Sequence, residues 1–236
     1  MSCSAKIPIY AVFCAAFFKK YQALVMIGLY ITGIVLGIII ALILKNTAFR
    51  GKPVPFVMEL PNYRLPSAKS VGLLLWDKAK DFIQRAFTVI FFATIIIWFL
   101  ETFDAKLNVV KDSSDSLLAL IGQAISPIFK PLGFADWRVT TSLISGFTAK
   151  EAVVSTMAVL MNTSTANLGT ALSGSFSTLS ALSFLVFTLL YTPCVAAVAT
   201  IKRELDSRIQ TVGVVIMQCM VAWLCGCAVY QIGALL

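Results

Sequence analysis

The stretch Leu179–Ile201 reads LSALSFLVFTLLYTPCVAAVATI and contains no charged residue. It is long enough to cross a bilayer, which takes about 20 apolar residues in a helix. Pro193 interrupts it, because proline has no backbone N–H and the carbonyl of Leu189 therefore loses its helical donor. A membrane tolerates such a break only where protein buries it or where it lines a wet cavity. The stretch predicts a transmembrane helix broken near Pro193.

The rest of the chain has the composition of an integral membrane protein. Hydrophobic residues make up 59% of it and charged residues 13%, whereas soluble domains carry roughly 25% charged residues. Two further uncharged stretches, Tyr21–Leu44 and Ile209–Leu236, are each long enough for one span. The expected fold class is all-α, a polytopic membrane helix bundle.

Other segments are shorter or interrupted. Ile7–Phe18 is too short to span and predicts a half-helix, while Ala86–Phe103 predicts a short span. Leu117–Leu132 contains two prolines and a lysine, so it either lies on the surface or enters the membrane partway. Val139–Met161 predicts a span that polar residues interrupt.

Positive charge is concentrated in one connector. Between Lys45 and Arg85 there are eight Lys or Arg residues against three acids. A nucleic-acid surface is one interpretation, but short basic loops beside spans mark the cytoplasmic side of a membrane, so we expect no nucleic-acid partner. Within the connector, Lys69–Arg85 has apolar residues at helical spacing. It predicts an interfacial amphipathic helix in contact with membrane lipid.

These segments predict a domain order and a topology. Residues 1–50 form the end of a first membrane region, 51–85 form the cytoplasmic connector, and 86–236 form a second membrane domain. If Leu117–Leu132 stays outside and the later spans alternate, Lys202–Arg208 lies on the far side. The C-terminus then lies on the cytoplasmic side.

Two of the six cysteines lie beside prolines and small polar residues. Cys3 lies in Met1-Ser-Cys-Ser-Ala-Lys-Ile-Pro-Ile-Tyr10, and Cys194 lies in Tyr191-Thr-Pro-Cys-Val-Ala-Ala197. Sulfur, hydroxyl groups and carbonyls freed by a helix break can replace water around a metal ion. The candidate metal ligands are therefore Cys3 and Cys194, and the pore-lining candidates are Ser2, Ser4, Thr192 and Pro193. The other cysteines lie in apolar runs, where a thiol packs as a small hydrophobe.

Two acidic residues are further ligand candidates. Glu151 follows Lys150 in Ser145-Gly-Phe-Thr-Ala-Lys-Glu-Ala152, and a charge at membrane depth costs at least about 2.5–3.5 kcal/mol. Glu151 therefore either faces a polar path or lies with Lys150 at a helix end in water, and the residues alone favour neither. Glu59, in Met58-Glu-Leu-Pro-Asn-Tyr63, is by itself an ordinary loop residue.

The residues of known catalytic sites are missing from the sequence. It contains no histidine, hence no Ser-His-Asp set, and no Gly-x-x-x-x-Gly-Lys-Ser/Thr phosphate loop. We therefore expect this chain to be no enzyme and to hold no cofactor.

Four motifs occur in the order seen in a known family. Ser2–Tyr10 resembles the first gate motif of FeoB-type ferrous iron transporters, and Pro55–Tyr63 resembles their Glu-Leu-Pro-x-Tyr connector. Gly146–Val154 resembles their Lys-Glu element, and Thr192–Glu204 resembles their second gate motif with the basic loop after it. The motifs span almost the whole chain, so together they are far more specific than any one of them.

The resemblance implies a ferrous iron permease with broken, gate-type helices in the inner membrane of a bacterium or archaeon. Cys3 and Cys194 match the gate cysteines proposed to contact iron, and Glu151 and Glu59 match the acidic residues of their motifs. Thiolate and carboxylate ligands both suit Fe²⁺, which is intermediate in softness. Fe²⁺ is thus the expected substrate.

The resemblance also implies that the chain is the C-terminal part of a longer transporter or a split gene product. The family's full chain begins with a GTPase domain, which uses GTP and Mg²⁺, and continues into earlier membrane helices. The expected partners are that N-terminal part and small Feo accessory proteins. A homo-oligomer is an open alternative.

Two other functions stay open. Transporters of nucleosides or other organic solutes share the broken-helix arrangement, although Gln and Asn rather than Cys are expected at their breaks. The second alternative is a non-transporting membrane subunit.

Overall fold

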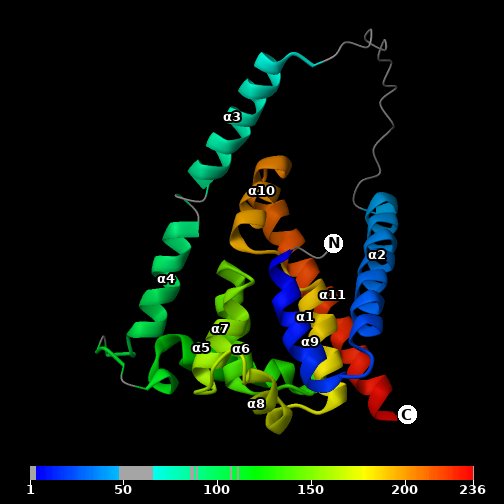
Figure 1. Ribbon diagram of the computed structural model, residues 1–236, viewed down its shortest axis with the longest axis vertical. Helices are drawn as coiled ribbons and strands as arrows, with labels where there is room; N and C mark the ends of the chain where they lie inside the picture. Colours follow the sequence, from blue (N-terminus) through cyan, green and yellow to red (C-terminus); the bar gives the residue numbers. More distant parts are fainter. Residues whose placement is uncertain are drawn as a thin grey trace.

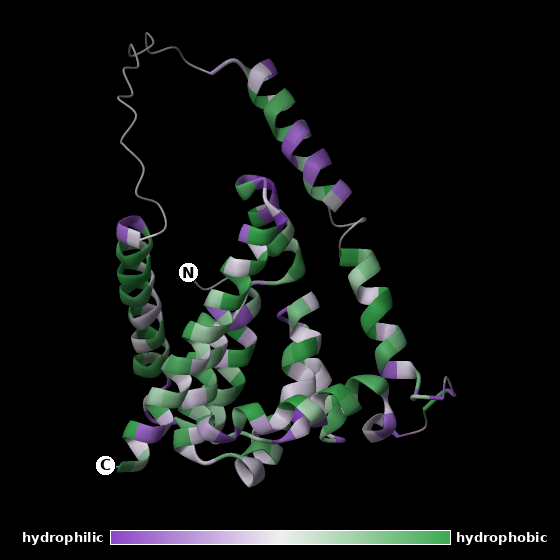
Figure 2. Ribbon diagram, turned by 180° about the vertical axis from the view of Figure 1, so that it is seen from behind, coloured by the Kyte–Doolittle hydropathy of each residue, from purple (hydrophilic) through white to green (hydrophobic). Residues whose placement is uncertain are grey.

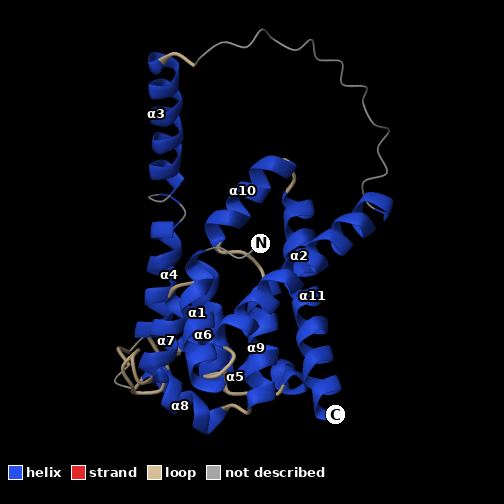
Figure 3. Cartoon of the chain, turned by 45° about the vertical axis from the view of Figure 1, so that its right-hand side comes forward, coloured by secondary structure: helices blue, strands red, loops and turns tan. Residues whose placement is uncertain are grey.

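The computed structural model describes residues 4–47, 66–85, 88, 90–106, 108–110 and 112–235, which are mostly helical (Figure 1 and Figure 3). Their α-helices are α1 (Ile7–Phe17), α2 (Gln22–Thr47), α3 (Ala68–Arg85), α4 (Phe91–Thr102), α5 (Leu117–Ile125), α6 (Trp137–Thr148), α7 (Ala152–Leu160), α8 (Leu168–Ser175), α9 (Thr178–Leu190), α10 (Val195–Leu205) and α11 (Arg208–Leu235). Short 3-10 helices are η1 (Ser4–Lys6), η3 (Ser113–Asp115) and η4 (Ser126–Leu132). These residues form no β-strand, so the predicted all-α fold class is confirmed.

Three helical stretches in the described residues are long and apolar enough to cross a membrane. They are Gln22–Thr47, Thr178–Leu205 and Arg208–Leu235, which correspond to α2, the pair α9 and α10, and α11. α2 and α11 expose large aliphatic side chains such as Leu24 and Leu224, and the ribbon of α2 is mostly hydrophobic in Figure 2. Such surfaces suit contact with lipid, whose tails are as apolar as leucine. The chain is therefore a multi-pass membrane protein.

Helix α9 lies at the centre of the bundle. Its Phe184 stacks on Phe13 of α1, with ring centroids 4.6 Å apart, and meets Phe134 edge to face at 5.3 Å. Aromatic pairs of this kind stabilise a core by about 0.5–1.5 kcal/mol beyond their burial. Ser183 of α9 donates a hydrogen bond of 2.9 Å to the carbonyl of Gly226 on α11. α9 therefore provides the surface on which α1 and α11 pack.

The helix break at Pro193 is present as predicted. α9 ends before this proline and α10 begins after Cys194, whose backbone is extended (φ −65°, ψ 164°). α1, which η1 directly precedes, forms the predicted half-helix with Pro8 in its first turn. Proline costs no helical hydrogen bond there, because the first N–H groups of a helix have no intrahelical acceptor.

The segment Val139–Met161 is not the single span that the sequence predicted. It forms α6, a short turn, and α7, which returns antiparallel to α6 (Figure 1). Ser145 Oγ lies 3.2 Å from Thr156 Oγ1, and a Cβ at Gly146 would collide with Val153. Gly146 thus permits the close approach of the two helices, since it has no side chain. The two helices form a re-entrant hairpin.

The hairpin changes the predicted topology. It adds no crossing, because α6 begins and α7 ends at the same end of the bundle (Figure 1). Arg203 of α10 contacts Asp81 of α3 at 3.2 Å, so the end of α10 lies on the same side as the connector. α11 then runs to the opposite end (Figure 1). The sequence predicts Lys202–Arg208 across the membrane from the connector, and the C-terminus on the same side as the connector. Both placements are therefore wrong.

Helix α3 forms in the position predicted for the amphipathic helix. Its apolar side chains, among them Leu74, Leu75 and Phe82, are exposed. Hydrophilic and hydrophobic residues both occur along it, in contrast to the uniformly apolar α2 (Figure 2). This pattern suits a helix that lies in the headgroup region of a bilayer.

The segment Leu117–Leu132 lies across the end of the bundle as α5 and η4 (Figure 1). Ser116 caps α5, because its hydroxyl accepts a hydrogen bond of 3.1 Å from the N–H of Ala119. The indole N–H of Trp223 on α11 donates to the carbonyl of Ile128 at 2.9 Å. The helical segment Leu117–Leu132 meets α6 at a bend of 105°. It is thus fixed to the bundle on both sides.

Candidate functional site

Two interruptions of helical structure and the start of a third helical segment meet around one cavity. They are the start of α1, the turn between α6 and α7, and the break between α9 and α10 (Figure 1). The cavity has a volume of about 300 Å³. Its lining residues are Lys6, Lys150, Leu189, Leu190, Tyr191, Pro193, Cys194, Ala197 and Gln218. The two gate motifs and the Lys-Glu element, distant in sequence, therefore build a single site.

Lys6 connects the start of α1 to the break between α9 and α10. Its amino group donates a buried hydrogen bond of 2.7 Å to the carbonyl of Leu189, and the residue is only 6% exposed. This carbonyl is the one that Pro193 leaves without a helical donor. The sequence suggested that it could face a cation, and in the structure it accepts a hydrogen bond from a lysine instead.

Lys150 lies at the tip of the α6–α7 hairpin and is 2% exposed. Its amino group is 3.5 Å from the centroid of the Tyr191 ring, within the range of a cation–π interaction. The hydroxyl of Tyr191 donates a hydrogen bond of 3.0 Å to the carbonyl of Leu143 on α6. Tyr191 therefore holds the hairpin against the break between α9 and α10.

Cysteine, threonine and glutamine side chains supply the other polar groups around the cavity. Cys194 is a free thiol, partly exposed, and Cys219 of α11 lies against the backbone of Thr192 and close to Lys150. Thr192 Oγ1 and Gln218 Oε1 are buried and have no hydrogen-bond partner in the described part of the chain. Buried polar atoms are nearly always paired, so these two mark a place suited to a polar occupant.

The structure brings some of the predicted site residues together. Cys194 and Pro193 line the cavity, and Thr192 is buried beside it at 3% exposure. Glu151 is exposed and does not belong to the lining. Ser4 begins η1, one turn before α1.

Three other predicted residues lie outside the described part of the chain. They are Cys3, Ser2 and Glu59. Their roles stay predictions.

The sequence interpretation missed the two lysines. Lys6 stands inside the first motif, two positions before Pro8, and no role is assigned from the sequence to Lys150 beside the ligand candidate Glu151. The signal that could have found them is their isolation, since each is a single basic residue within apolar sequence at a predicted break. A lysine in such a position is costly unless the fold gives it acceptors.

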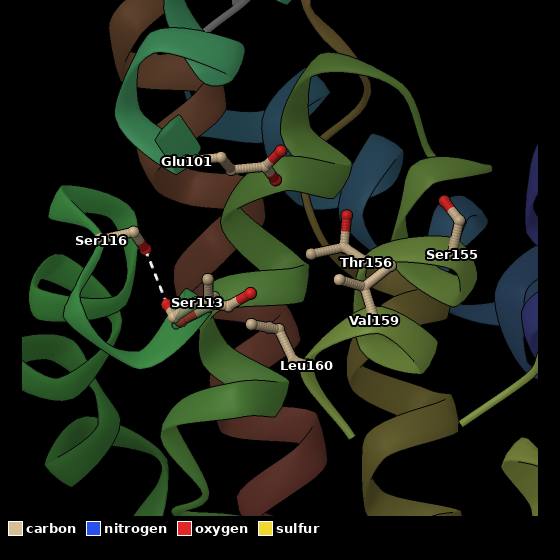
Figure 4. A pocket seen from close by; sticks show the side chains of 8 residues that line it. Glu101, Ser113, Ser116, Ser155, Thr156, Val159 and Leu160 are labelled. Carbon is tan, nitrogen blue, oxygen red and sulfur yellow. Dashed lines mark hydrogen bonds between the residues drawn. The ribbon is translucent and has the colours of Figure 1, made fainter. Parts of the chain in front are cut away.

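A second polar cavity, of about 280 Å³, lies beside the lower half of the hairpin (Figure 4). It is lined by Glu101, Ser113, Ser116, Thr141, Ser155, Thr156, Val159 and Leu160. Ser145 Oγ donates to Glu101 Oε1 at 3.4 Å and is also in contact with Thr156 Oγ1. One carboxylate thus faces a surface formed mainly by hydroxyl groups.

In the described residues, no group of three or more His, Cys, Asp or Glu side chains is arranged to hold a metal ion.

The chain matches two known families. Residues 83–208 match the Gate family, described as nucleoside recognition, and residues 26–78 match the C terminus of ferrous iron transport protein B. The first match covers α4 and α5, both arms of the hairpin and the break at Pro193. No solved structure matches the chain at significant similarity.

Curated relatives agree with these matches. The chain is 37% identical over 235 residues to the Fe(2+) transporter FeoB of Staphylococcus aureus strain MSSA476, covering 100% of this chain and 35% of that protein. It is 36% identical over 212 residues to FeoB of Methanocaldococcus jannaschii, covering 87% of this chain and 32% of that protein. A Porphyromonas gingivalis protein that fuses Fe(2+) transport protein A to FeoB is 33% identical over 283 residues, covering 100% of this chain and 33% of that protein. The chain spans about a third of the length of these relatives.

Proposed function

We propose that the chain, which belongs to the FeoB family, forms part of the pathway by which ferrous iron crosses a membrane. The observation that carries this proposal is the position of Cys194. It lies at the break between α9 and α10 and lines a cavity to which the start of α1 and the α6–α7 turn also contribute. Broken helices that meet within a bundle are the usual place for ion sites in transporters.

The chemistry of the cavity supports passage of Fe²⁺. The ion is intermediate in softness, so the sulfur of Cys194 can bind it together with harder oxygens. The hydroxyl of Thr192 and the side-chain carbonyl of Gln218 are the available oxygens, because both are buried and have no partner in the described residues. Such a mixed set of ligands favours entry and release over retention.

The remaining assignments concern the whole transporter. Cys3 would supply the matching sulfur from the first gate motif, and Glu59 and Glu151 would act as acidic contacts outside this cavity. Coupling to GTP hydrolysis in another part of the protein and an inner-membrane location are supported by the family resemblance. The division at residue 85 lies near the boundary between the two family matches, 26–78 and 83–208, whereas the division at residue 50 rests on the sequence pattern. The fusion found in Porphyromonas gingivalis supports association with a small Feo protein.

A second candidate function is transport of a nucleoside or another organic solute. The description of the Gate family, nucleoside recognition over residues 83–208, favours it. The cavity offers Gln218 as the one amide side chain among its described lining residues. A cavity for a nucleoside would be expected to present several such groups, so ferrous iron is the better match.

The test is uptake of radiolabelled Fe²⁺ by cells that express the complete transporter. We expect Cys194→Ser to lower uptake while the amount of protein in the membrane stays unchanged. Cys227→Ser on α11 is the matched control, because this partly buried cysteine does not line the cavity. Normal uptake by Cys194→Ser would remove Cys194 from the pathway, and uptake of a labelled nucleoside instead of Fe²⁺ would support the second candidate.

A further inference from the structure

We propose that Lys6 is a tethered cation that closes this cavity, and that Lys6 and Lys150 together decide which ions enter it. This inference rests on the proposed function for the identity of the transported ion, but not for the charge selectivity of the cavity. It follows from where the two amino groups lie.

The acceptor of the Lys6 hydrogen bond is a backbone carbonyl at a helix break. At a helix break, the carbonyl that has lost its N–H donor is the backbone oxygen available to a passing cation. At Pro193 this oxygen belongs to Leu189, and the amino group of Lys6 lies 2.7 Å from it. A lysine ammonium is a compact point charge with three donors, so it takes the position that a permeating cation would need.

Positively charged side chains line the cavity. Lys6 and Lys150 both line it, and none of its described lining residues is acidic. The N-terminus of α10 begins at Cys194 and adds the partial positive charge of a helix start. Two unit charges 4 Å apart interact with about 4 kcal/mol at an effective dielectric constant of 20. In this arrangement the cavity therefore repels Fe²⁺ and attracts anions.

Passage of a cation requires both lysine contacts to break. For a cation to pass Cys194, the Lys6 amino group must leave the Leu189 carbonyl, and the hairpin tip with Lys150 must move away from Tyr191. Both contacts join separate segments, so movement between α1, the hairpin and α9 breaks them. The structure thus shows a closed arrangement in which the lysines act as the barrier.

The test compares two thiol reagents of opposite charge on the complete protein in membrane vesicles. An anionic and a cationic methanethiosulfonate are applied, and modification of Cys194 is measured by mass spectrometry of its peptide. We expect the ratio of the anionic to the cationic reaction rate to be about tenfold higher at Cys194 than at a free thiol, because a cleft of one charge sign concentrates counter-ions by at least about tenfold. This wild-type measurement needs no variant.

Variants then assign the effect to the lysines. Lys6→Met and Lys150→Met should each bring the reagent ratio toward that of a free thiol, and Lys6→Met should raise modification of Cys194 by both reagents. Lys6→Arg, which keeps the charge, should retain the preference for the anionic reagent. Lys19→Met is the matched control, since Lys19 is an exposed residue at the other end of α1.

The outcomes separate this inference from the proposed function. A wild-type ratio equal to that of a free thiol, or one that neither lysine substitution changes, would overturn it. Absence of modification in the wild type and in every variant would also overturn it, because the barrier would then not be a lysine. A charge preference that depends on Lys6, together with normal Fe²⁺ uptake by Cys194→Ser, would retain the tethered cation and remove Cys194 from the iron pathway.

A different observation carries a second inference: we infer that the cavity at Glu101 binds a hydrated divalent cation. Glu101 is the one acidic residue among its described lining residues, which also include five hydroxyl residues and two aliphatic ones: Ser113, Ser116, Thr141, Ser155, Thr156, Val159 and Leu160. Figure 4 shows the carboxylate extending from α4 toward the hairpin, above these groups. Its volume of about 280 Å³ leaves room for an ion with its water shell. Carboxylate, hydroxyl and water oxygens are the ligands of hard divalent cations.

The position of this cavity on the hairpin makes it an access site. Ser145 joins Glu101 to Thr156 through contacts of 3.4 Å and 3.2 Å, and Lys150 lies at the tip of the same hairpin. Ser145 is one helical turn below Thr148, which is also buried. Two buried hydroxyl residues of α6, Ser145 and Thr148, therefore lie between the contact with Glu101 and the tip of the hairpin.

The test uses Mn²⁺ as the probe, with binding to the purified complete protein in lipid nanodiscs followed by electron paramagnetic resonance. Glu101→Gln should weaken binding at least about tenfold, because even the loss of an outer partner of a metal site costs about 10–100-fold. Asp112→Asn is the control, as a nearby acid that does not line the cavity. Equal Mn²⁺ binding by the wild type and Glu101→Gln, or an equal loss in Asp112→Asn, would overturn the inference whatever the result for Fe²⁺ transport.

Discussion

The amino group of Lys150 lies 3.5 Å from the centroid of the Tyr191 ring, and this contact joins the tip of the α6–α7 hairpin to the break between α9 and α10. The hydroxyl of Tyr191 adds a hydrogen bond to Leu143. One side chain therefore makes two separable contacts with the hairpin.

Substitutions of Tyr191 can separate these contacts. Tyr191→Phe keeps the ring face under Lys150 and loses only the hydrogen bond, which contributes about 0.5–1.5 kcal/mol. Tyr191→Leu also loses the cation–π contact, worth about 2 kcal/mol when desolvated. We expect the free energy of unfolding in detergent to fall in the order wild type, Tyr191→Phe, Tyr191→Leu. Equal destabilisation by the two variants would show that the ring face contributes nothing.

Gly146, the single glycine of residues 137–160, should be sensitive to substitution. A Cβ there would collide with Val153, so Gly146→Ala should destabilise the protein by about 1–3 kcal/mol, the usual cost of overpacking. Gly174 in α8 has no atom within 4 Å of the position of an added Cβ. Gly174→Ala should therefore be neutral or stabilise by up to about 1 kcal/mol, because alanine favours helix. Thermal unfolding of both variants checks the contrast, which fails if their midpoints shift alike.

The corrected topology predicts which positions can be labelled from each side of the membrane. Ser70→Cys on α3 and Lys202→Cys on α10 should react with an impermeant thiol reagent from the same side, since Asp81 and Arg203 join these two helices. Leu235→Cys at the end of α11 should react only from the other side. The sites are resolved by mass spectrometry in right-side-out and inverted vesicles. Labelling of Ser70→Cys and Lys202→Cys from opposite sides would contradict the re-entrant hairpin.

Asp104 should make the loop after α4 sensitive to acid. The N–H of Asn108 and the N–H of Lys106 donate to its carboxylate at 2.9 Å and 2.7 Å, and these hydrogen bonds lower the pKa of Asp104. The unfolded value is about 3.9, so the stabilisation is fully present above that pH and is lost as the pH falls through the lower folded pKa. Hydrogen-exchange protection of the two amides should drop in that range. Asp104→Ala should remove this pH dependence, and a wild type without it would refute the argument.

The sequence was most informative where one signal dominated. Length and lack of charge predicted α2 and α11, and the missing N–H of Pro193 predicted the break between α9 and α10. These features are local, because a single residue type determines each of them. The position of Cys194 at the site followed from that break.

The parts that were missed depend on contacts between distant segments. Val139–Met161 has the length of a span, and only the packing of Gly146 against Val153 shows that it turns back. Lys6 finds its acceptor at Leu189, 183 positions away, and no local pattern indicates that pairing. The wrong side for the C-terminus followed directly from counting the hairpin as a crossing.

The re-entrant hairpin also has a mechanical consequence. Both of its ends are anchored at one face of the bilayer, so its tip can advance or retract without pulling a polar loop through the lipid. A small displacement of the ends of α6 and α7 at that face would therefore also move Lys150 at the tip. Movement at one face of the membrane can thus shift the positive charge of Lys150 at the centre of the protein.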